Sequence, residues 1–230
     1  MENYGYIKKN YDALTEELAD IAKGVGIAPP KLVCVTKSGS DEELASLVRA
    51  GATDIGENRP GEVKRRFELL CGLGLKVNMH EIGTLQRNKI KLVAPCAAMI
   101  HSVDSKKLAE DIGRKATECG RVIPVLIEVN SAAEENKSGV LPGDAERLLN
   151  EILEIPGISV EGLMTMGPVS EDPEALCPYF RQTKKLFDSL RERYGFGPTP
   201  TLSMGMSDSY RIAVEEGSTL VRVGRKLFIK

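Results

Sequence analysis

The chain has only two histidines, His80 and His101, and neither has a cysteine or carboxylate at metal-ligand spacing. The sequence therefore predicts no metal site. It also lacks a glycine-rich phosphate loop and a serine–histidine–aspartate arrangement, and residues 51–56 carry no glycine fingerprint for a dinucleotide. These absences argue against a P-loop nucleotidase, a triad hydrolase and a nicotinamide-dependent enzyme.

The chain also has no large excess of positive or negative charge. The 31 lysines and arginines nearly balance the 33 acidic residues, so neither nucleic acid nor an anionic membrane is indicated as a partner. The basic cluster 64–66 is predicted to be a solvated helix face. No apolar run approaches the length of a membrane span, and a charged helical pattern follows Met1, so we expect a cytoplasmic protein. The scattered cysteines, without a CxxC pair, indicate reduced thiols: Cys34, Cys71, Cys96, Cys119 and Cys177.

Short apolar runs alternate regularly with helical patterns. The predicted strands are 32–35, 54–56, 77–82, 99–103, 122–129, 159–164, 201–203 and 219–223. The predicted helices between them are 41–51, 61–70, 85–93, 105–119, 144–153, 173–194 and 207–216. This alternation predicts an α/β protein, a single-domain (β/α)8 TIM barrel over residues 1–230, with an open doubly wound sheet as the alternative.

An extra helix is predicted at the N-terminus, over residues 2–23. The segment after the last strand, 224–230, is too short for a helix. We therefore expect the N-terminal helix to cover that side of the barrel. No exposed apolar face can be identified from the sequence, which favours a monomer.

Lys37 directly follows the first apolar run, in the stretch VCVTKSGS. If its stem lay back over the strand ends, partial burial would lower its pKa and favour attack on an aldehyde. The ordinary alternative is a lysine that ends a strand and reaches water. This stretch alone favours the ordinary alternative.

Polar residues follow most of the other strands, where a barrel of this class has its active site. In the seventh loop, Ser203, Gly205 and Ser207 precede a predicted helix start that could bind an anion. A plain serine N-cap would explain the same pattern. Gly224 adds a second position for close backbone approach. Together, the two loops leave the choice between phosphate site and simple turn open.

Arg222 alternates with Val221 and Val223, so it is predicted to point into the barrel. It needs an acceptor there. One alternative is a carboxylate such as Glu57 or Glu81. The other is the unprotonated ring nitrogen of a bound heterocycle.

Nine motifs in this order resemble the pyridoxal phosphate homeostasis proteins, single-domain relatives of the alanine racemase barrel. They are VCVTKSGS (33–40), IGEN (55–58), HEIGTLQRNKIK (80–91), HSVDS (101–105), EVN (128–130), NKSGV (136–140), GLMTM (162–166), LSMGMSDSY (202–210) and EGSTLVRVG (216–224). Each motif alone is weakly specific, but the ordered set covers nearly the whole chain.

The resemblance implies a fold-type III barrel that holds pyridoxal 5′-phosphate (PLP) as a Schiff base on Lys37. It implies that Arg222 faces the pyridine nitrogen. Residues expected around the phosphate are Ser203, Gly205, Met206, Ser207 and Gly224, and those expected along the ring or its pocket are Asn58, His80, Asn130 and Met204. The family acts in vitamin B6 and amino-acid homeostasis without established turnover, so PLP-dependent apoenzymes are the expected partners.

The chain departs from the family pattern at four positions. Met79 and Glu81 replace the aromatic residues on either side of the histidine, and Arg59 replaces a tyrosine. Arg225 replaces a small or hydroxylic residue. Loss of the aromatic residues is expected to loosen packing around the ring. Arg225 is expected either to pair with the phosphate or to block its hydroxyl contact.

The expected role is reversible storage and delivery of PLP. A neutral ring nitrogen weakens the cofactor as an electron sink, and Tyr210 is the only tyrosine near the predicted rim. Two alternatives remain. One is a PLP-dependent amino-acid racemase, and the other is a barrel enzyme in which Lys37 forms a Schiff base with a phosphorylated metabolite.

Overall fold

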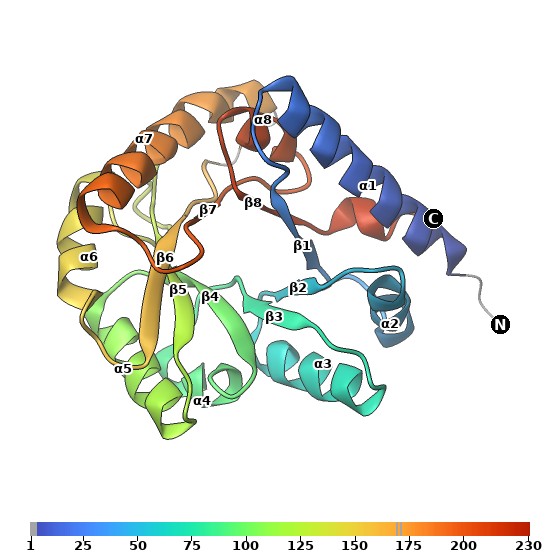
Figure 1. The fold of residues 1–230 in the computed structure, drawn as a ribbon, viewed down its shortest axis with the longest axis horizontal. Helices are drawn as coiled ribbons and strands as arrows, with labels where there is room; N and C mark the ends of the chain where they lie inside the picture. The colour runs from blue at the N-terminus through green and yellow to red at the C-terminus, as the bar shows by residue number, and fades with distance from the viewer. Residues whose placement is uncertain (1–3, 169, 171) are drawn as a thin grey trace.

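Eight parallel strands close into a barrel in the computed structural model, which describes residues 4–168, 170 and 172–230 (Figure 1). The strands follow one another around the barrel in chain order, and β8 pairs with β1 to close it. Their bounds are β1 Lys31–Val35, β2 Asp54–Glu57, β3 Asn78–Glu81, β4 Ala97–Val103, β5 Ile123–Glu128, β6 Ile158–Met164, β7 Thr201–Ser203 and β8 Leu220–Val223. The predicted (β/α)8 barrel is confirmed, and each strand lies close to its predicted limits.

Helices surround the barrel, with two departures from prediction. Their bounds are α1 Gly5–Gly24, α2 Asp41–Arg49, α3 Pro60–Gly72, α4 Ile90–Val93, α5 Lys106–Glu118, α6 Ala145–Ile152, α7 Cys177–Tyr194 and α8 Tyr210–Glu215. The helix predicted over 85–93 is wrong in extent, because Gln86 is extended and a 3-10 turn, Arg87–Lys89, precedes one α-helical turn. Helix α8 begins at Tyr210, three residues later than predicted.

Helix α1 covers the side of the barrel where the last strand lacks a full helix (Figure 1). It contacts α2, α8 and the 3-10 turn Arg225–Leu227. One face of α1, comprising Ile7, Leu14, Leu18 and Ala22, is buried. The Asn10 side chain donates to the carbonyl of Ile229 at 2.8 Å. The predicted covering role of the N-terminal helix is confirmed for its described part, which begins at residue 4.

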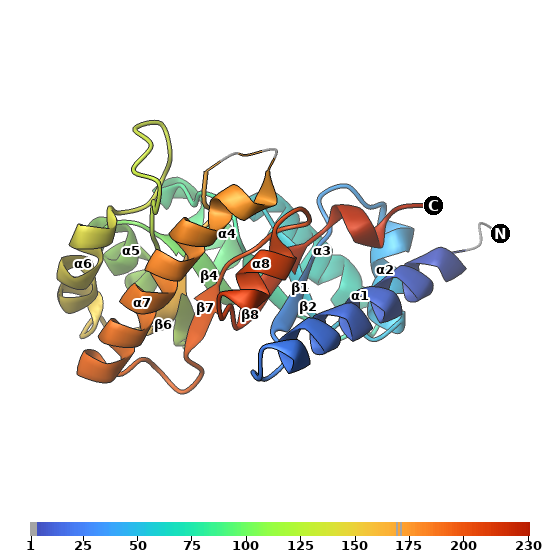
Figure 2. The ribbon, with the colours of Figure 1, turned by 90° about the horizontal axis from the view of Figure 1, so that it is seen from above.

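The barrel interior is separate from the main core, which lies between the sheet and the helices. Met99, Leu126 and Met164, from three neighbouring strands, form a small apolar cluster of their own. Their neighbours Val125 and Ile127 belong to the main core, as the alternation of a strand requires. The loops after β5 and β6 project from the same end of the barrel (Figure 2). This end is formed by the carboxyl ends of the strands.

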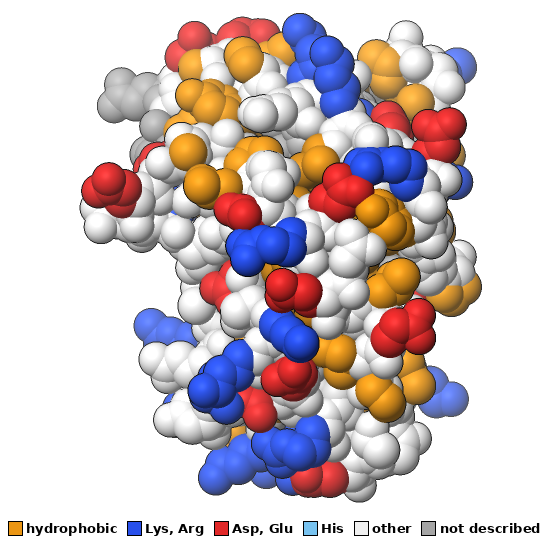
Figure 3. All heavy atoms as spheres, turned by 90° about the vertical axis from the view of Figure 1, so that its left-hand side faces the viewer, with side chains coloured by type: hydrophobic (Ala, Val, Ile, Leu, Met, Phe, Trp, Pro, Cys, Tyr) orange, Lys and Arg blue, Asp and Glu red, His pale blue; other side chains and the backbone are white. Residues whose placement is uncertain are grey.

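The outer surface mixes charges of both signs. Across the face of α5, α6 and α7, lysines and arginines lie beside acidic residues (Figure 3). One ion pair, between Arg193 and Glu146, joins α7 to α6. All five cysteines are unpaired thiols. Within the described ranges, no helix is both long and apolar enough to cross a membrane.

Candidate functional site

Lys37 lies just beyond β1, at the carboxyl end of the barrel. By strand alternation, Lys37 points to the same side as Val33 and Val35. These two valines face Gly56, where a Cβ would lie 2.7 Å from Val33 and 3.6 Å from Val35. Lys37 is exposed, so the burial considered from the sequence is not present. No group in the described part of the chain forms a hydrogen bond or ion pair with its amine. The amine is therefore open to a ligand at the barrel mouth.

A cavity of about 500 Å³ lies beside Lys37. Its lining includes Ser38 from the same loop and Asn58 and Arg59 from the loop after β2. Asn58 and Arg59 are both exposed. The structure thus brings Lys37 and Asn58, two of the residues predicted for the site, to one cavity.

A buried ion pair lies behind the Lys37 loop. Arg66 of α3 and Glu57 of β2 are 5% and 1% exposed, and their charged groups are 3.2 Å apart. The guanidinium also donates to the carbonyls of Thr36 at 2.8 Å and Gly39 at 3.0 Å. Burial raises the pKa of Glu57, whereas hydrogen bonding from Thr36 and the charge of Arg66 oppose that shift. Arg66 thus fixes the backbone on both sides of Lys37.

This position of Arg66 corrects the prediction of a solvated basic face over 64–66. Lys64 and Arg65 are exposed, and Arg65 forms an ion pair with Asp41 at 2.7 Å. Arg66 instead points between the helix and the sheet. The three residues are consecutive, so a helix must direct them to different sides.

Arg222 points into the barrel, as its alternation predicts. Its Nη1 donates to Ser203 Oγ at 2.5 Å and its Nη2 donates to the carbonyl of Thr165 at 3.1 Å. The predicted carboxylate partners, Glu57 and Glu81, lie on the outer face of the sheet, so that alternative is wrong. Burial lowers the pKa of Arg222 to about 10, and the group remains charged at neutral pH.

His80 lies inside the barrel rather than on an open pocket wall. It is 2% exposed. Its Nε2 lies 3.0 Å from Asp54 Oδ1, and its Nδ1 lies 2.9 Å from His101 Nε2. His101 Nδ1 in turn lies 3.1 Å from Ser203 Oγ. The hydroxyl of Ser203, expected near the phosphate, is therefore engaged by His101 and Arg222.

The loops after β7 and β8 are tied to each other by Ser207. Its Oγ accepts hydrogen bonds from the amides of Gly224 at 3.3 Å and Arg225 at 3.2 Å. Ser207 thus does not cap α8, which corrects the predicted helix start. Because α8 has only six residues, any phosphate here would be bound by loop groups rather than by a helix terminus. Arg225 forms an ion pair with Asp208.

Two glycines allow these loops to pass close to the barrel. Gly205 has a φ of +91°, and a Cβ on it would lie 2.5 Å from Ala213 Cβ. A Cβ on Gly224 would lie 2.7 Å from the carbonyl oxygen of Val35. Both positions therefore require glycine for a structural reason.

Three further predicted residues have distinct places. Met204 is fully buried in the main core, which removes it from the ring pocket. Asn130 is 9% exposed, and its side chain bonds the backbone of Glu134 and Lys137. It therefore supports the loop after β5. Met206 is 40% exposed at the rim.

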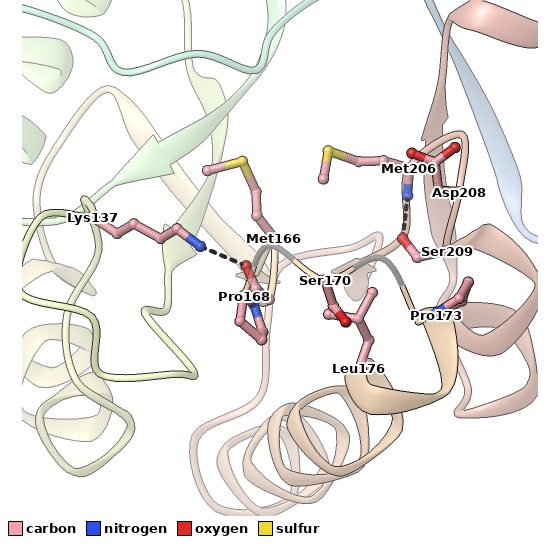
Figure 4. A pocket seen from close by; sticks show the side chains of 10 residues that line it. Lys137, Met166, Pro168, Ser170, Pro173, Leu176, Met206, Asp208 and Ser209 are labelled. Atoms are coloured by element: carbon pink, nitrogen blue, oxygen red, sulfur yellow. Dashed lines mark hydrogen bonds between the residues drawn. The ribbon is translucent and has the colours of Figure 1, made fainter.

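Met206 lines a second cavity, of about 260 Å³, between the loops after β5, β6 and β7. Figure 4 shows its side chain beside that of Met166, with Leu176 below them. Lys137 also lines this cavity; its amine donates to the carbonyl of Gly167 at 3.1 Å and forms an ion pair with Glu134 at 2.8 Å. The cavity is mainly apolar, and its lysine is already paired.

Met79 and Glu81 point away from the barrel interior. Each alternates with His80, which faces inward, and Met79 belongs to the main core. The expected loss of aromatic walls around a bound ring is therefore wrong for Met79 and Glu81, which do not face the mouth, whereas Arg59 does line the cavity beside Lys37. Burial, reinforced by the charge of Glu57, raises the pKa of Glu81 to about 8. Its Oε2 has no hydrogen-bond partner in the described chain.

Glu81 should make stability depend on pH. Because its pKa is higher in the folded than in the unfolded state, its contribution is complete below the unfolded pKa and is lost as the pH rises toward 8. We expect Glu81→Gln to remove roughly 2–4 kcal/mol of this loss between pH 5 and 9, measured by urea unfolding. Glu42→Gln, at an exposed site, is the control. Equal pH dependence in parent and Glu81→Gln would contradict this assignment.

Glu128 is a site residue that the sequence reasoning did not assign. It lies on the inward face of β5 and is 4% exposed, and its Oε2 has no partner in the described ranges. Burial and the charge of Asp104 raise its pKa to about 7, whereas Arg222 opposes the shift. In the sequence, only the position of Glu128 in the motif EVN indicated a place in the site.

No group of three or more His, Cys, Asp or Glu side chains in the described chain could hold a metal ion.

Comparisons of this chain with family models and with known proteins point to the same family. Residues 10–229 match the family model described as alanine racemase, N-terminal domain. The pyridoxal phosphate homeostasis protein of Aquifex aeolicus is 41% identical over 198 residues, 86% of each chain. That of Helicobacter pylori is 36% identical over 200 residues, again 86% of each chain.

A solved structure of PipY from Synechococcus elongatus, described with PLP bound, superposes with a TM-score of 0.84 at 28% identity. The match covers 97% of this chain and 100% of that chain. The similarity thus extends through the whole barrel and its rim loops. The chain belongs to the pyridoxal phosphate homeostasis proteins, within the family that shares the N-terminal barrel of alanine racemase.

Proposed function

We propose that this protein binds PLP reversibly at the mouth of the barrel, with Lys37 as its covalent anchor, and stores and delivers it. The observation that carries the proposal is the exposed, unpaired amine of Lys37 at the same end of the barrel as the loops of Ser207 and Gly224. PLP supplies an aldehyde, and its condensation with the amine forms a C=N bond and releases water. Hydrolysis or exchange with another amine reverses this step.

The residues present fit the other parts of such a ligand. Arg222 is a buried permanent donor inside the barrel, suited to an unprotonated ring nitrogen. Ser207 holds two loop amides and has no acceptor for its own hydroxyl proton in the described chain, so it can donate to a phosphate oxygen. Glu128 leaves one buried oxygen without a partner. The relative described with PLP bound supports the same assignment.

Storage is favoured over turnover by the position of the rim tyrosine. The Tyr210 hydroxyl donates to Glu17 of α1, on the outside of the barrel. It is therefore not placed to act as a second base across a ring at the mouth. Amines and PLP-dependent apoenzymes are the proposed recipients.

The test is to add PLP, remove the excess by desalting, and record the visible spectrum. We expect a protonated-imine band, and after borohydride reduction and digestion we expect the label on Lys37. We also expect deuterium exchange at Cα of amino acids no faster than with free PLP. Label spread over many exposed lysines, or a colourless protein that binds a sugar phosphate instead, would refute the proposal.

A further inference from the structure

An unbroken series of buried polar side chains crosses the barrel interior. Asp54, His80, His101, Ser203 and Arg222 come from five different strands, and each is at most 4% exposed. The successive separations are 3.0, 2.9, 3.1 and 2.5 Å, each within hydrogen-bond range. The two imidazole rings meet edge to face. The series begins at the first residue of β2 and ends at the arginine that the proposed ligand requires.

The direction of these hydrogen bonds follows from the arginine, which can only donate. Ser203 Oγ accepts from Arg222, so its own proton is free to go to His101 Nδ1. His101 then carries its proton on Nε2 and donates to His80 Nδ1. His80 likewise carries its proton on Nε2 and donates to Asp54. Both histidines are thus neutral Nε2–H tautomers.

The reverse direction is disfavoured at both ends. It would require His80 to be doubly protonated and would leave Ser203 with two donors and no acceptor in the described chain for its proton. Burial holds the pKa of His101 well below its ordinary value, and the charge of Arg222 lowers it further. Burial alone would raise the pKa of Asp54, but hydrogen bonds from His80 and Thr53 hold it well below its ordinary value.

Asp54 is a fixed anchor for the series. Thr53 donates to its Oδ2 at 2.7 Å and Asn78 donates to its Oδ1 at 3.2 Å. The ammonium of Lys31, at the amino end of β1, lies 3.5 Å from Oδ1. A carboxylate held in this way remains ionised and keeps its acceptor direction.

We propose that Asp54, His80, His101 and Ser203 are positioning residues that act as one relay, fixing the orientation of the Arg222 guanidinium from the opposite end of the barrel. Each bond polarises the next, so a change at one member reaches the others. The second hydrogen bond, from Arg222 to Thr165, sets the plane of the guanidinium. The remaining N–H groups of the Arg222 guanidinium then point in a fixed direction, along which one of them can donate to a ring nitrogen. This last step rests on the proposed function, whereas the relay itself does not.

The test of the relay uses the cofactor-free protein and Ser203→Ala, a small change that removes one hydroxyl. Nitrogen-15 NMR of the two imidazoles reports which nitrogen carries each proton. In the parent protein we expect both histidines as Nε2–H tautomers. In Ser203→Ala, His101 loses its donor at Nδ1. Because Asp54 still fixes both tautomers, we expect the tautomers to persist but the nitrogen-15 shifts to move at His101 and also at His80, which does not touch Ser203.

Two variants serve as controls. Ser203→Thr keeps the hydroxyl and should preserve the nitrogen-15 shifts of both rings. Ser102→Ala removes a buried hydroxyl that has no partner in the described ranges, and it should also leave these shifts unchanged. Unchanged His80 shifts in Ser203→Ala would overturn the relay, because a local structural role would not extend beyond His101.

The link to Arg222 is measured separately, by equilibrium titration with PLP. We expect Ser203→Ala to weaken PLP binding about tenfold, as for the loss of one hydrogen bond to a charged group, and Ser203→Thr to restore it. Weaker PLP binding in Ser203→Ala with unchanged His80 nitrogen-15 shifts would overturn the relay and assign Ser203 to direct contact. If the His80 shifts move in Ser203→Ala but the parent protein does not bind PLP, the relay is supported and the proposed function is refuted.

Discussion

Exchange of Lys37 for alanine is expected to abolish the covalent retention of PLP. The imine needs a primary amine at the barrel mouth, and in the described chain Lys37 is the lysine at the carboxyl end of β1 with no partner of its own. The visible imine band and the borohydride-fixed label should both disappear. Weak non-covalent binding should remain, because Arg222 and the loops of Ser207 and Gly224 are unchanged. The measurement is the spectrum after desalting, with mass analysis of the reduced protein.

Lys91→Ala is the matched control. Lys91 is also exposed and has no ion pair in the described ranges, but it lies on α4. It should retain the full band and label. A band of equal intensity in Lys37→Ala would show that another amine carries PLP and would remove the basis of the proposed site.

The barrel could be predicted from the sequence because the alternation of strand and helix patterns is visible in short stretches of the chain. Each strand is a short apolar run, and each helix has its own buried stripe, so neighbouring residues contain the information. The exception at helix α8 has a cause that is not local. Helix α8 starts late because Ser207 bonds the amides of Gly224 and Arg225 instead of the helix start. That contact joins two loops, and no pattern within the seventh loop could reveal it.

The sequence predicted which residues belong to the site better than it predicted which partners they contact. Alternation correctly placed Arg222 inside the barrel, but its partner, Ser203, comes from the neighbouring strand. His80 was predicted for a pocket wall, whereas its contacts are Asp54 and His101, which the closed barrel brings together. Pairing across a barrel depends on register, and register is a property of the assembled sheet.

Exchange of Arg66 for methionine is expected to lower the free energy of unfolding by about 3–5 kcal/mol, as for loss of one partner of a buried ion pair. Glu57, only 1% exposed, would keep its hydrogen bond from Thr36 but lose its cation. The carbonyls of Thr36 and Gly39 would lose their donor as well. Urea unfolding measures the loss. Arg65→Met, at the exposed neighbour, should cost less than about 1 kcal/mol.

The cause of the loss can be separated from simple repacking. If the unpaired carboxylate dominates, the double variant Glu57→Gln/Arg66→Met should recover part of the stability. The loss in Arg66→Met should also shrink as the pH falls, because burial raises the pKa of Glu57 and protonation removes its unpaired charge. A loss that is independent of pH and unrelieved in the double variant would assign the role of Arg66 to packing. Since the same guanidinium bonds the backbone on both sides of Lys37, slower labelling of Lys37 by PLP should accompany the loss of stability.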